Sequence, residues 1–394
     1  MRNLKAAEVA ISDWCPILTR EPHAMPKETL PITPAIVRWA RERAGFSLEE
    51  LAADFNKIAE WERGEGGPTY PQLETLAGKL KVPVAVFFFP TPPQTPPVEE
   101  TFRTLPDAAL ASLPSRMKML LRKAKAMQLN LVELHSGRNP SERLITREVH
   151  ITSATPIASM AEHVRAYLGV ALHEQQRWAN PETALKNWRE ALQSVGIYVF
   201  KDAFKAPNFS GFCLTDPQFP IIYVNNSCAK TRQIFTLFHE LAHLLFATSG
   251  IDAIEEIDAR PGVGSRIEVI CNQFAAEFLM PQAEFVRARA NAPATEETAE
   301  QLAALFNVSR ELVFRRFLDR GEISAATYRD ASERWANQRQ EGSGGDYYRT
   351  QLAYLGRDYI SLAFSAFYQN RIDESQLASY LDICLLYTSD AADE

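Results

Sequence analysis

The residues best suited to chemistry lie in Arg232–Phe246, which has the sequence RQIFTLFHELAHLLF and contains His239-Glu240-x-x-His243. Residues four apart lie on one face of a helix, so both imidazoles can reach one zinc ion, and Glu240 can reach a water molecule on that ion. Zinc lowers the pKa of such a water to roughly 7, and Glu240 would act as the general base and then protonate a leaving amine. The pattern predicts His239 and His243 as metal ligands and Glu240 as the catalytic residue.

The alternative is a core helix whose polar groups are satisfied internally. The segment is apolar on nearly all sides, as is typical of a buried helix. Burying two histidines and a glutamate there without a use would be costly. With only seven histidines in 394 residues, a chance match to the motif is about one in a hundred. The metal site is therefore the favoured interpretation.

A third protein ligand is expected on the next predicted helix, Ile267–Pro281, with the sequence IEVICNQFAAEFLMP. Glu268 lies at its start and is the expected ligand, while Asn272 lies four residues later and is expected to orient a ligand. Glu277 is the competing candidate for the third ligand. Cys271 is interpreted as a small core residue.

The run HELAHLLF, followed by Glu268, Asn272 and FAAEFLMP, resembles the ImmA/IrrE family of zinc metallo-endopeptidases. The resemblance implies a gluzincin-like site with His239, His243 and Glu268 on zinc and Glu240 as the base. It also implies that the substrate is a repressor or an antitoxin-like protein. In zincins the strand before the active-site helix, here Ile221–Asn225, is expected to pair along its edge with an extended substrate.

Composition indicates an ordinary globular protein with 46% hydrophobic and 23% charged residues and a net charge of −7. This charge gives no overall attraction to nucleic acid. The five cysteines form no CxxC pair, which favours a reducing compartment. No apolar run is long enough to span a membrane, and no signal-peptide pattern is present. We expect a cytoplasmic protein without a membrane partner.

Residues 34–90 are predicted to form a compact helical unit, with Thr33 as the first N-cap and Ser47-Leu48-Glu49-Glu50 as a capping box. The stretches WARERAGFSLEELA, IAEWERGE and PTYPQLETLA resemble the Xre/Cro-type helix-turn-helix domain. The resemblance implies DNA binding, with contacts from Lys57, Glu60 and Arg63.

Two observations favour a packing or dimerisation module instead. Only Ala53–Lys57 separates the second predicted helix from IAEWERGE, so part of the turn and of the recognition helix is missing relative to the family. Residues 34–90 also carry seven basic and eight acidic side chains, which gives no electrostatic footprint for DNA. DNA binding and homodimer formation both stay open.

The expected fold is α+β and mostly helical, with a helix-turn-helix domain, a zincin-like domain with a small sheet, and a helical C-terminal extension. The expected parts are an arm (1–33), the Xre-type domain (34–90), a Pro-rich linker and basic helix (91–154), the ImmA/IrrE-like zinc metallopeptidase domain (155–290), a helix-turn-helix-like segment (291–340), a helical extension (346–383) and a non-native tail (384–394). The segment 291–340 is expected to be a helical cap or a sensor of the partner. The loop Gly250–Arg266 is expected to be a simple connection or a lid over the metal.

Two functions fit these patterns. The first is an intracellular zinc endopeptidase coupled to a DNA- or partner-binding module, which cleaves a repressor or antitoxin-like protein to control transcription. The alternative is a transcription regulator whose metal domain is a non-catalytic sensing or structural module.

Overall fold

The computed structural model describes the chain between residues 29 and 383, with several gaps. The described segments are residues 29–80, 82–93, 113–152, 154–206, 209–246, 251–253, 266–337 and 347–383. The expected arm up to residue 28, the expected tail 384–394 and most of the expected lid, residues 254–265, lie outside the described residues. The chain divides into two compact units, residues 1–95 and 96–394.

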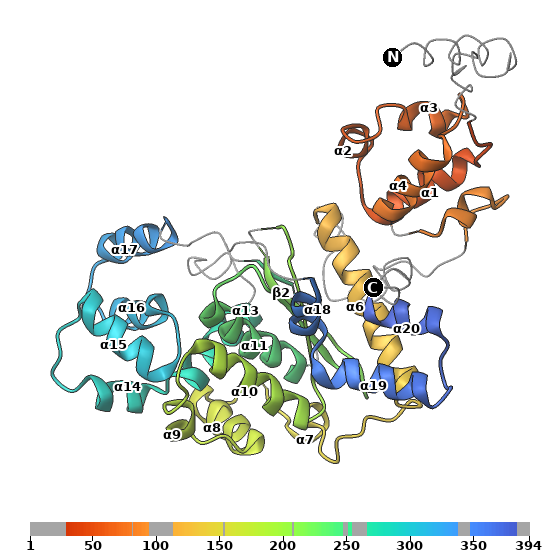
Figure 1. The fold of residues 1–394 in the computed structure, drawn as a ribbon. Helices are drawn as coiled ribbons and strands as arrows, with labels where there is room; N and C mark the ends of the chain where they lie inside the picture. The colour runs from red at the N-terminus through yellow and green to blue at the C-terminus, as the bar shows by residue number, and fades with distance from the viewer. Residues whose placement is uncertain are drawn as a thin grey trace, which may run out of the picture. The chain divides into compact units, whose positions relative to one another are not determined.

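The first unit consists of short helices around its own apolar core (Figure 1). Its elements are α1 (Pro34–Ala44), α2 (Leu48–Ala52), α3 (Ile58–Arg63), α4 (Tyr70–Leu80) and the 3-10 helix η1 (Val84–Phe88). The predicted capping box is present, because the Ser47 hydroxyl accepts from the Glu50 amide and the Glu50 carboxylate accepts from the Ser47 amide. Thr33 is the N-cap of α1, but its side chain makes no capping hydrogen bond.

The second unit is α+β and mostly helical, which confirms the predicted fold class. Its helices are α6 (Ser115–Leu134), α7 (Ile145–Glu148), α8 (Ile157–Leu168), α9 (Leu172–Gln175), α10 (Pro181–Ser194), α11 (Lys230–Leu245), α13 (Arg266–Leu279), α14 (Gln282–Arg289), α15 (Glu296–Phe306), α16 (Arg310–Asp319), α17 (Ala325–Asn337), α18 (Tyr347–Leu355), α19 (Arg357–Tyr368) and α20 (Glu374–Leu381). Its strands are β1 (Tyr198–Asp202), β2 (Phe209–Leu214), β3 (Ile221–Asn225) and β4 (Ile251–Ala253).

The four strands form one mixed sheet in the order β1-β3-β2-β4. Strands β2 and β3 pair as an antiparallel hairpin, and β1 pairs with β3 in parallel. The expectation that β3 offers an edge to substrate is wrong, because β3 is hydrogen-bonded on both sides. The physical reason is that β1, whose residues are all buried, pairs with β3 and covers its free edge, so that β3 becomes an interior strand. The short strand β4 lies at the far edge, next to β2.

Alternate residues of the strands face two different apolar cores, as expected for a sheet covered on both sides. Val199, Cys213 and Ile222 belong to the core that contains α8, α10, α11 and α13. Phe200, Phe212 and Tyr223 belong to the core formed with α6, α19 and α20. In Figure 1, α6 lies with α19 and α20 on one side of the sheet, and α10 and α11 lie on the other.

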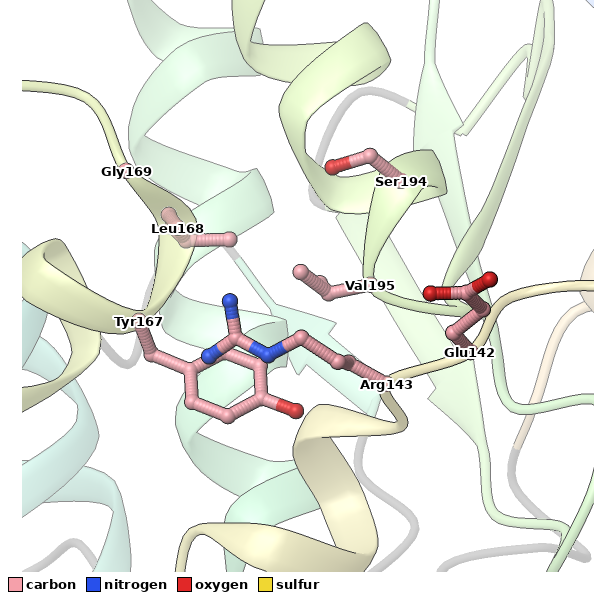
Figure 2. Close-up of a pocket in the computed structure, with 7 residues that line it drawn as sticks. All are labelled: Glu142, Arg143, Tyr167, Leu168, Gly169, Ser194 and Val195. Carbon is pink, nitrogen blue, oxygen red and sulfur yellow. The ribbon is translucent and has the colours of Figure 1, made fainter.

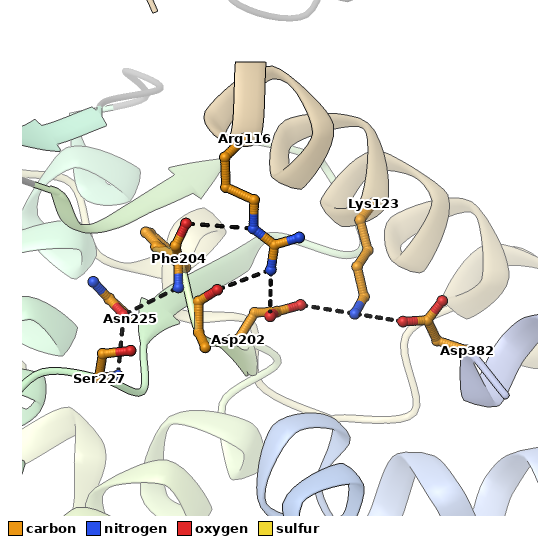
Figure 3. A network of polar contacts seen from close by, with 8 residues as sticks. Arg116, Lys123, Asp202, Phe204, Asn225, Ser227 and Asp382 are labelled. Carbon is orange, nitrogen blue, oxygen red and sulfur yellow. Dashed lines mark hydrogen bonds and ion pairs between the residues drawn. The ribbon is translucent and has the colours of Figure 1, made fainter. Parts of the chain in front are cut away.

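A polar network joins α6 to β1 and to the end of α20 (Figure 3). The Arg116 guanidinium donates to the Asp202 carboxylate at 2.9 Å. Lys123 donates to Asp202 at 2.8 Å and to Asp382 at 2.7 Å. Burial alone would lower the pKa of Lys123, but the surrounding negative groups outweigh this and raise it. The network therefore fixes the first and last described helices of this unit to the sheet.

The segment after α13 belongs to the same core as the metal-site helices. Phe306, Val313 and Phe317, from α15 and α16, join that core. Asn307 takes the left-handed conformation (φ 55°) between α15 and α16, and Ser309 caps α16 through the Leu312 amide. The segment therefore packs against the helices that carry the predicted site. Among the described helices, none is long and apolar enough to cross a membrane.

Candidate metal centre

Helix α11 is the central element of the second unit and positions the histidine motif. From Gln233 to Leu245 its side chains are buried, apart from the half-buried Phe235. Its apolar residues form the core on all sides, which fixes the rotation of the helix about its axis. Helix α13 packs along it, with the Phe238 and Phe278 rings stacked 4.1 Å apart. This packing brings the start of α13 next to the His239–His243 face.

Three potential ligands converge between the two helices. The Nε2 atoms of His239 and His243 lie 3.1 Å apart. Glu268 places carboxylate oxygens 3.3 Å from His239 Nε2 and 3.2 Å from His243 Nε2. Tetrahedral zinc with ligand bonds of about 2.0–2.1 Å separates neighbouring ligand atoms by about 3.3 Å. The spacing and chemistry of this donor set therefore fit a small divalent cation such as zinc.

Asn272 positions one of these imidazoles. Its Oδ1 atom lies 3.0 Å from His239 Nδ1. If Nδ1 carries the proton and donates it to this carbonyl oxygen, the lone pair of Nε2 faces the convergence point. The sequence-predicted pairing of Asn272 with a ligand is present in the geometry.

The Glu268 carboxylate is the most exposed of the three groups, with 19% of its side chain accessible against 0% for His239. Burial alone would raise its pKa, but hydrogen bonds from His239 and His243 outweigh this and lower the pKa to about 2. Glu268 is therefore ionised throughout the neutral range, as a metal-ligating carboxylate must be.

Glu277, the competing candidate for the third ligand, is engaged elsewhere. Its carboxylate accepts from Arg316 at 2.8 Å and from the Gln282 amide at 2.9 Å. Cys271 is buried in the apolar core, which agrees with its interpretation as a small core residue. Within the described part of the chain, the geometry brings Glu268, and not Glu277, to the two histidines.

Comparison with protein families gives a match for this region. Residues 192–318 match the Peptidase_M78 family, described as the IrrE N-terminal-like domain. This IrrE N-terminal-like segment runs from the end of α10 to α16 and contains His239, Glu240, His243, Glu268 and Asn272. The match supports a metallopeptidase-like domain at the position that the histidine motif predicts.

Comparisons with whole proteins add little. No curated protein matches the chain. A solved structure of a Mycobacterium tuberculosis transcriptional regulator is 18% identical, with a TM-score of 0.28, and the match covers 41% of this chain and 46% of that one. The chain therefore matches less than half the length of that structure.

Glu240 lies in the IrrE N-terminal-like segment, on α11 next to strand β2. It is fully buried. Gly211 of β2 approaches this part of α11 closely, because a Cβ atom on Gly211 would lie 2.4 Å from Thr236 Cγ2 and 3.8 Å from Glu240 Cγ. A residue without a side chain is therefore needed where the strand crosses the helix.

A cavity of about 960 Å³ lies beside the metal centre. Glu268 and Asn272 line one end, with Phe235 of α11. Residues of α15, α16 and α17, including Leu312, also belong to the lining, together with residues of α8, α10 and α11. No motif of the sequence indicates this cavity. Phe235 precedes His239 by one helical turn and could have been found from that spacing, whereas Leu312 is brought there only by the tertiary fold.

A smaller cavity of about 300 Å³ lies between α8, α10 and the segment before α7 (Figure 2). The Arg143 guanidinium carbon lies over the Tyr167 ring, 3.9 Å from its centre, and the two side chains form one wall. The cavity contains none of the predicted site residues, and we assign it no role.

The predicted DNA-contact residues lie together on and just before α3. Lys57 is the N-cap position of α3 and is exposed, and Glu60 is half-buried. Arg63 is exposed and forms an ion pair with Glu65 at 2.8 Å. Helix α3 has only six residues, which agrees with the shortened segment seen in the sequence.

Proposed function

We propose that this protein is a zinc-dependent endopeptidase. The observation that carries the proposal is the convergence of His239 Nε2, His243 Nε2 and the Glu268 carboxylate within 3.1–3.3 Å of one another. The match of residues 192–318 to the Peptidase_M78 family supports the same assignment.

His239, His243 and Glu268 would hold the zinc ion through two nitrogens and one carboxylate, which leaves a coordination position open. When bound, zinc supplies a Lewis acid that makes water more acidic and polarises a peptide carbonyl. Asn272 keeps the His239 ring in the orientation and tautomer that ligation needs. Glu240 acts as the general base that accepts the proton of the attacking water and as the acid that returns it to the leaving amine.

We propose further that the substrate is a repressor or antitoxin-like protein and that its cleavage controls transcription. The support is the resemblance of the N-terminal helical unit to Xre/Cro domains, together with its separation from the catalytic unit. Such a tethered module would raise the local concentration of the peptidase near a partner on DNA.

The test compares wild type with Glu240→Gln and His239→Ala. We expect one zinc ion per wild-type chain, the same zinc content in Glu240→Gln, and none in His239→Ala. Loss of the general base should slow peptide hydrolysis at least about 100-fold. If Glu240→Gln retains zinc and every cellular effect of the protein persists, the peptidase assignment fails and the protein is a regulator with a non-catalytic metal domain.

The DNA-binding part has its own test. A mobility-shift assay with DNA from the protein's own promoter region should show binding that weakens as salt rises, and Lys57→Ala should reduce it. Binding that is absent at low salt would leave residues 34–90 with a packing or dimerisation role.

A further inference from the structure

The large cavity reaches one of the three proposed zinc ligands, Glu268. Glu268 and Asn272 belong to its lining, and α13 continues along it to Glu277. With a helix rise of about 1.5 Å per residue, this stretch of α13 spans about 14 Å, which matches roughly four residues of an extended peptide. The cavity therefore has the length to bind the segment that flanks the bond to be cut.

Two apolar side chains, Phe235 and Val269, line the cavity close to the proposed zinc ligands. The Phe235 ring lies 6.4 Å from the ring of His239, centre to centre. Val269 follows Glu268 directly and is 45% exposed, which makes it one of the few large apolar side chains left accessible on the second unit. An exposed valine next to a proposed zinc ligand indicates a surface for an apolar side chain of a substrate.

The opposite wall comes from α16 and α17. Leu312, Tyr328 and Trp335 contribute apolar surface to it. The Arg310 guanidinium carbon lies 4.7 Å from the centre of the Trp335 ring. A fixed link joins this wall to α13, because Arg316 of α16 donates to Glu277 at 2.8 Å and to the Met280 carbonyl at 3.1 Å. The wall is therefore held in place relative to the metal-site helix.

The charges around the cavity balance. Its lining includes four arginines and five acidic residues. Two of the arginines are already paired, Arg316 with Glu277 and Arg315 with Asp319. Such a lining gives no net attraction to a polyanion such as nucleic acid. The binding of a ligand in this cavity must therefore depend mainly on its shape and on apolar contacts.

We propose that this cavity is the substrate cleft and that Val269 and Leu312 select polypeptide segments with large apolar side chains close to the cleaved bond. This inference rests on the proposed peptidase function and adds a substrate class to it. The occupant is an extended segment of an unfolded or locally unfolded protein, because a groove of this length between helices takes a single strand and not a folded surface. Helices α15–α17 are thus part of the specificity machinery.

The test uses the zinc-loaded full-length chain and short fluorescein-labelled peptides. One set carries Leu or Phe at its centre, and the matched set carries Ser there. The variants are Val269→Asp and Leu312→Glu. Their controls are Val286→Asp on α14, where the valine is 46% exposed, and Leu305→Glu on α15, where the leucine is 38% exposed. Neither control residue lines the cavity.

Val269→Asp and Leu312→Glu should each raise KM for the Leu and Phe peptides about tenfold, because an apolar contact is replaced by a charge. Zinc content should not change, kcat should change little, and the control variants should behave like wild type. Thermal unfolding identifies a variant that has lost its fold, and Val269→Asp, at an exposed position, keeps the test decisive if Leu312→Glu is unstable.

Binding to the Glu240→Gln protein, measured by fluorescence anisotropy, separates this inference from the proposed function. If the Leu and Phe peptides bind tightly but wild type does not cleave them, the proposed peptidase function is wrong, while the assignment of the cavity as a peptide-binding cleft is supported. If wild type, Val269→Asp and Leu312→Glu cleave the peptides with the same KM, the assignment of the cavity as the substrate cleft is wrong, while the proposed peptidase function is supported. Equal binding of the Ser peptides, or no binding of either set, would also overturn the apolar selectivity.

Discussion

Asn272 shows how one amide can decide the state of a proposed metal ligand, His239. Its carbonyl oxygen lies 3.0 Å from His239 Nδ1, on the far side of the ring from the convergence point. Without this acceptor, the His239 ring could rotate, and its proton could move to the nitrogen that must face the metal. We therefore expect Asn272 to act on zinc binding indirectly, through the orientation of the His239 ring.

Asn272→Ala should lower zinc affinity about 10- to 100-fold, as is typical for the loss of a group that orients a ligand. The measurement is competition with a chromogenic chelator at fixed pH. Gln273→Ala is the control, since this neighbouring amide is exposed and contacts neither histidine. Equal affinities in the two variants would show that Asn272 does not hold the ring.

The pH dependence of zinc binding follows from the ligands. The pKa of Glu268 is lowered to about 2 by its histidine partners, so its carboxylate remains ionised as the pH falls from 7 to 4. Imidazoles ordinarily gain a proton at about pH 6.5, and a protonated imidazole cannot bind a metal ion. A loss of zinc in acid is therefore expected from the proposed histidine ligands and not from the carboxylate.

We expect zinc content and peptide hydrolysis to fall together below about pH 6. The measurement is metal analysis after dialysis at each pH, with circular dichroism to show that the fold persists. Unchanged zinc content and activity down to pH 4 would contradict the assignment of two histidine ligands.

At the scale of elements, the crossing of β2 and α11 fixes the place of Glu240. The strand passes so close to the helix that a Cβ atom on Gly211 would lie 2.4 Å from Thr236 Cγ2 and 3.0 Å from the Tyr223 carbonyl oxygen. Thr236 belongs to the turn of α11 just before Glu240. The position of the proposed base, Glu240, therefore depends on how closely β2 can approach α11.

Gly211→Ala should destabilise the fold by about 1–3 kcal/mol, because the added methyl group overpacks the interface of strand and helix. Hydrolysis should fall by more than the loss of folded protein explains, since α11 must shift at Thr236. Thermal unfolding and kcat are the measurements. Gly78→Ala is the control, because Gly78 lies exposed in α4 with no atom within 4 Å of the new Cβ. If the Gly211→Ala protein were fully active and as stable as wild type, the position of Glu240 would not depend on the close approach of β2 to α11.

At the scale of the whole molecule, residues that are distant in the sequence come together around the sheet. Arg116 and Lys123 come from α6, Asp202 from β1 and Asp382 from the end of α20 (Figure 3). Arg189 of α10 donates to the carbonyls of Ala353, at 2.9 Å, and Tyr354, at 3.2 Å, and so holds the C-terminal end of α18. The C-terminal helices are therefore part of the second unit and not an independent appendage.

Asp202→Asn should lower the free energy of unfolding of the second unit by about 2–3 kcal/mol, because Lys123 and Arg116 lose a largely buried negative partner. Urea unfolding followed by tryptophan fluorescence is the measurement. Lys186→Ala breaks only the exposed pair with Glu190 and should change stability by less than about 0.5 kcal/mol. Similar effects of both substitutions would show that the network contributes nothing beyond surface pairing.

The sequence by itself determined the features that depend on local geometry. Helical periodicity places His239 and His243 on one face, and it likewise places Glu268 and Asn272 one turn apart, because these relations need only one helix. The capping box at Ser47 is local in the same way. Their energies come from residues close in the chain, so a pattern of residue types is enough to find them.

Only the tertiary structure decided which distant groups meet. It brought Glu268 to the histidines while Arg316 took Glu277, and it placed β1 beside β3, so that β3 became an interior strand. It also set α15–α17 opposite α13 to form the cavity wall. These outcomes depend on how the apolar faces of whole helices and strands pack together. Because many contacts between distant residues contribute, no single position of the sequence predicts the result.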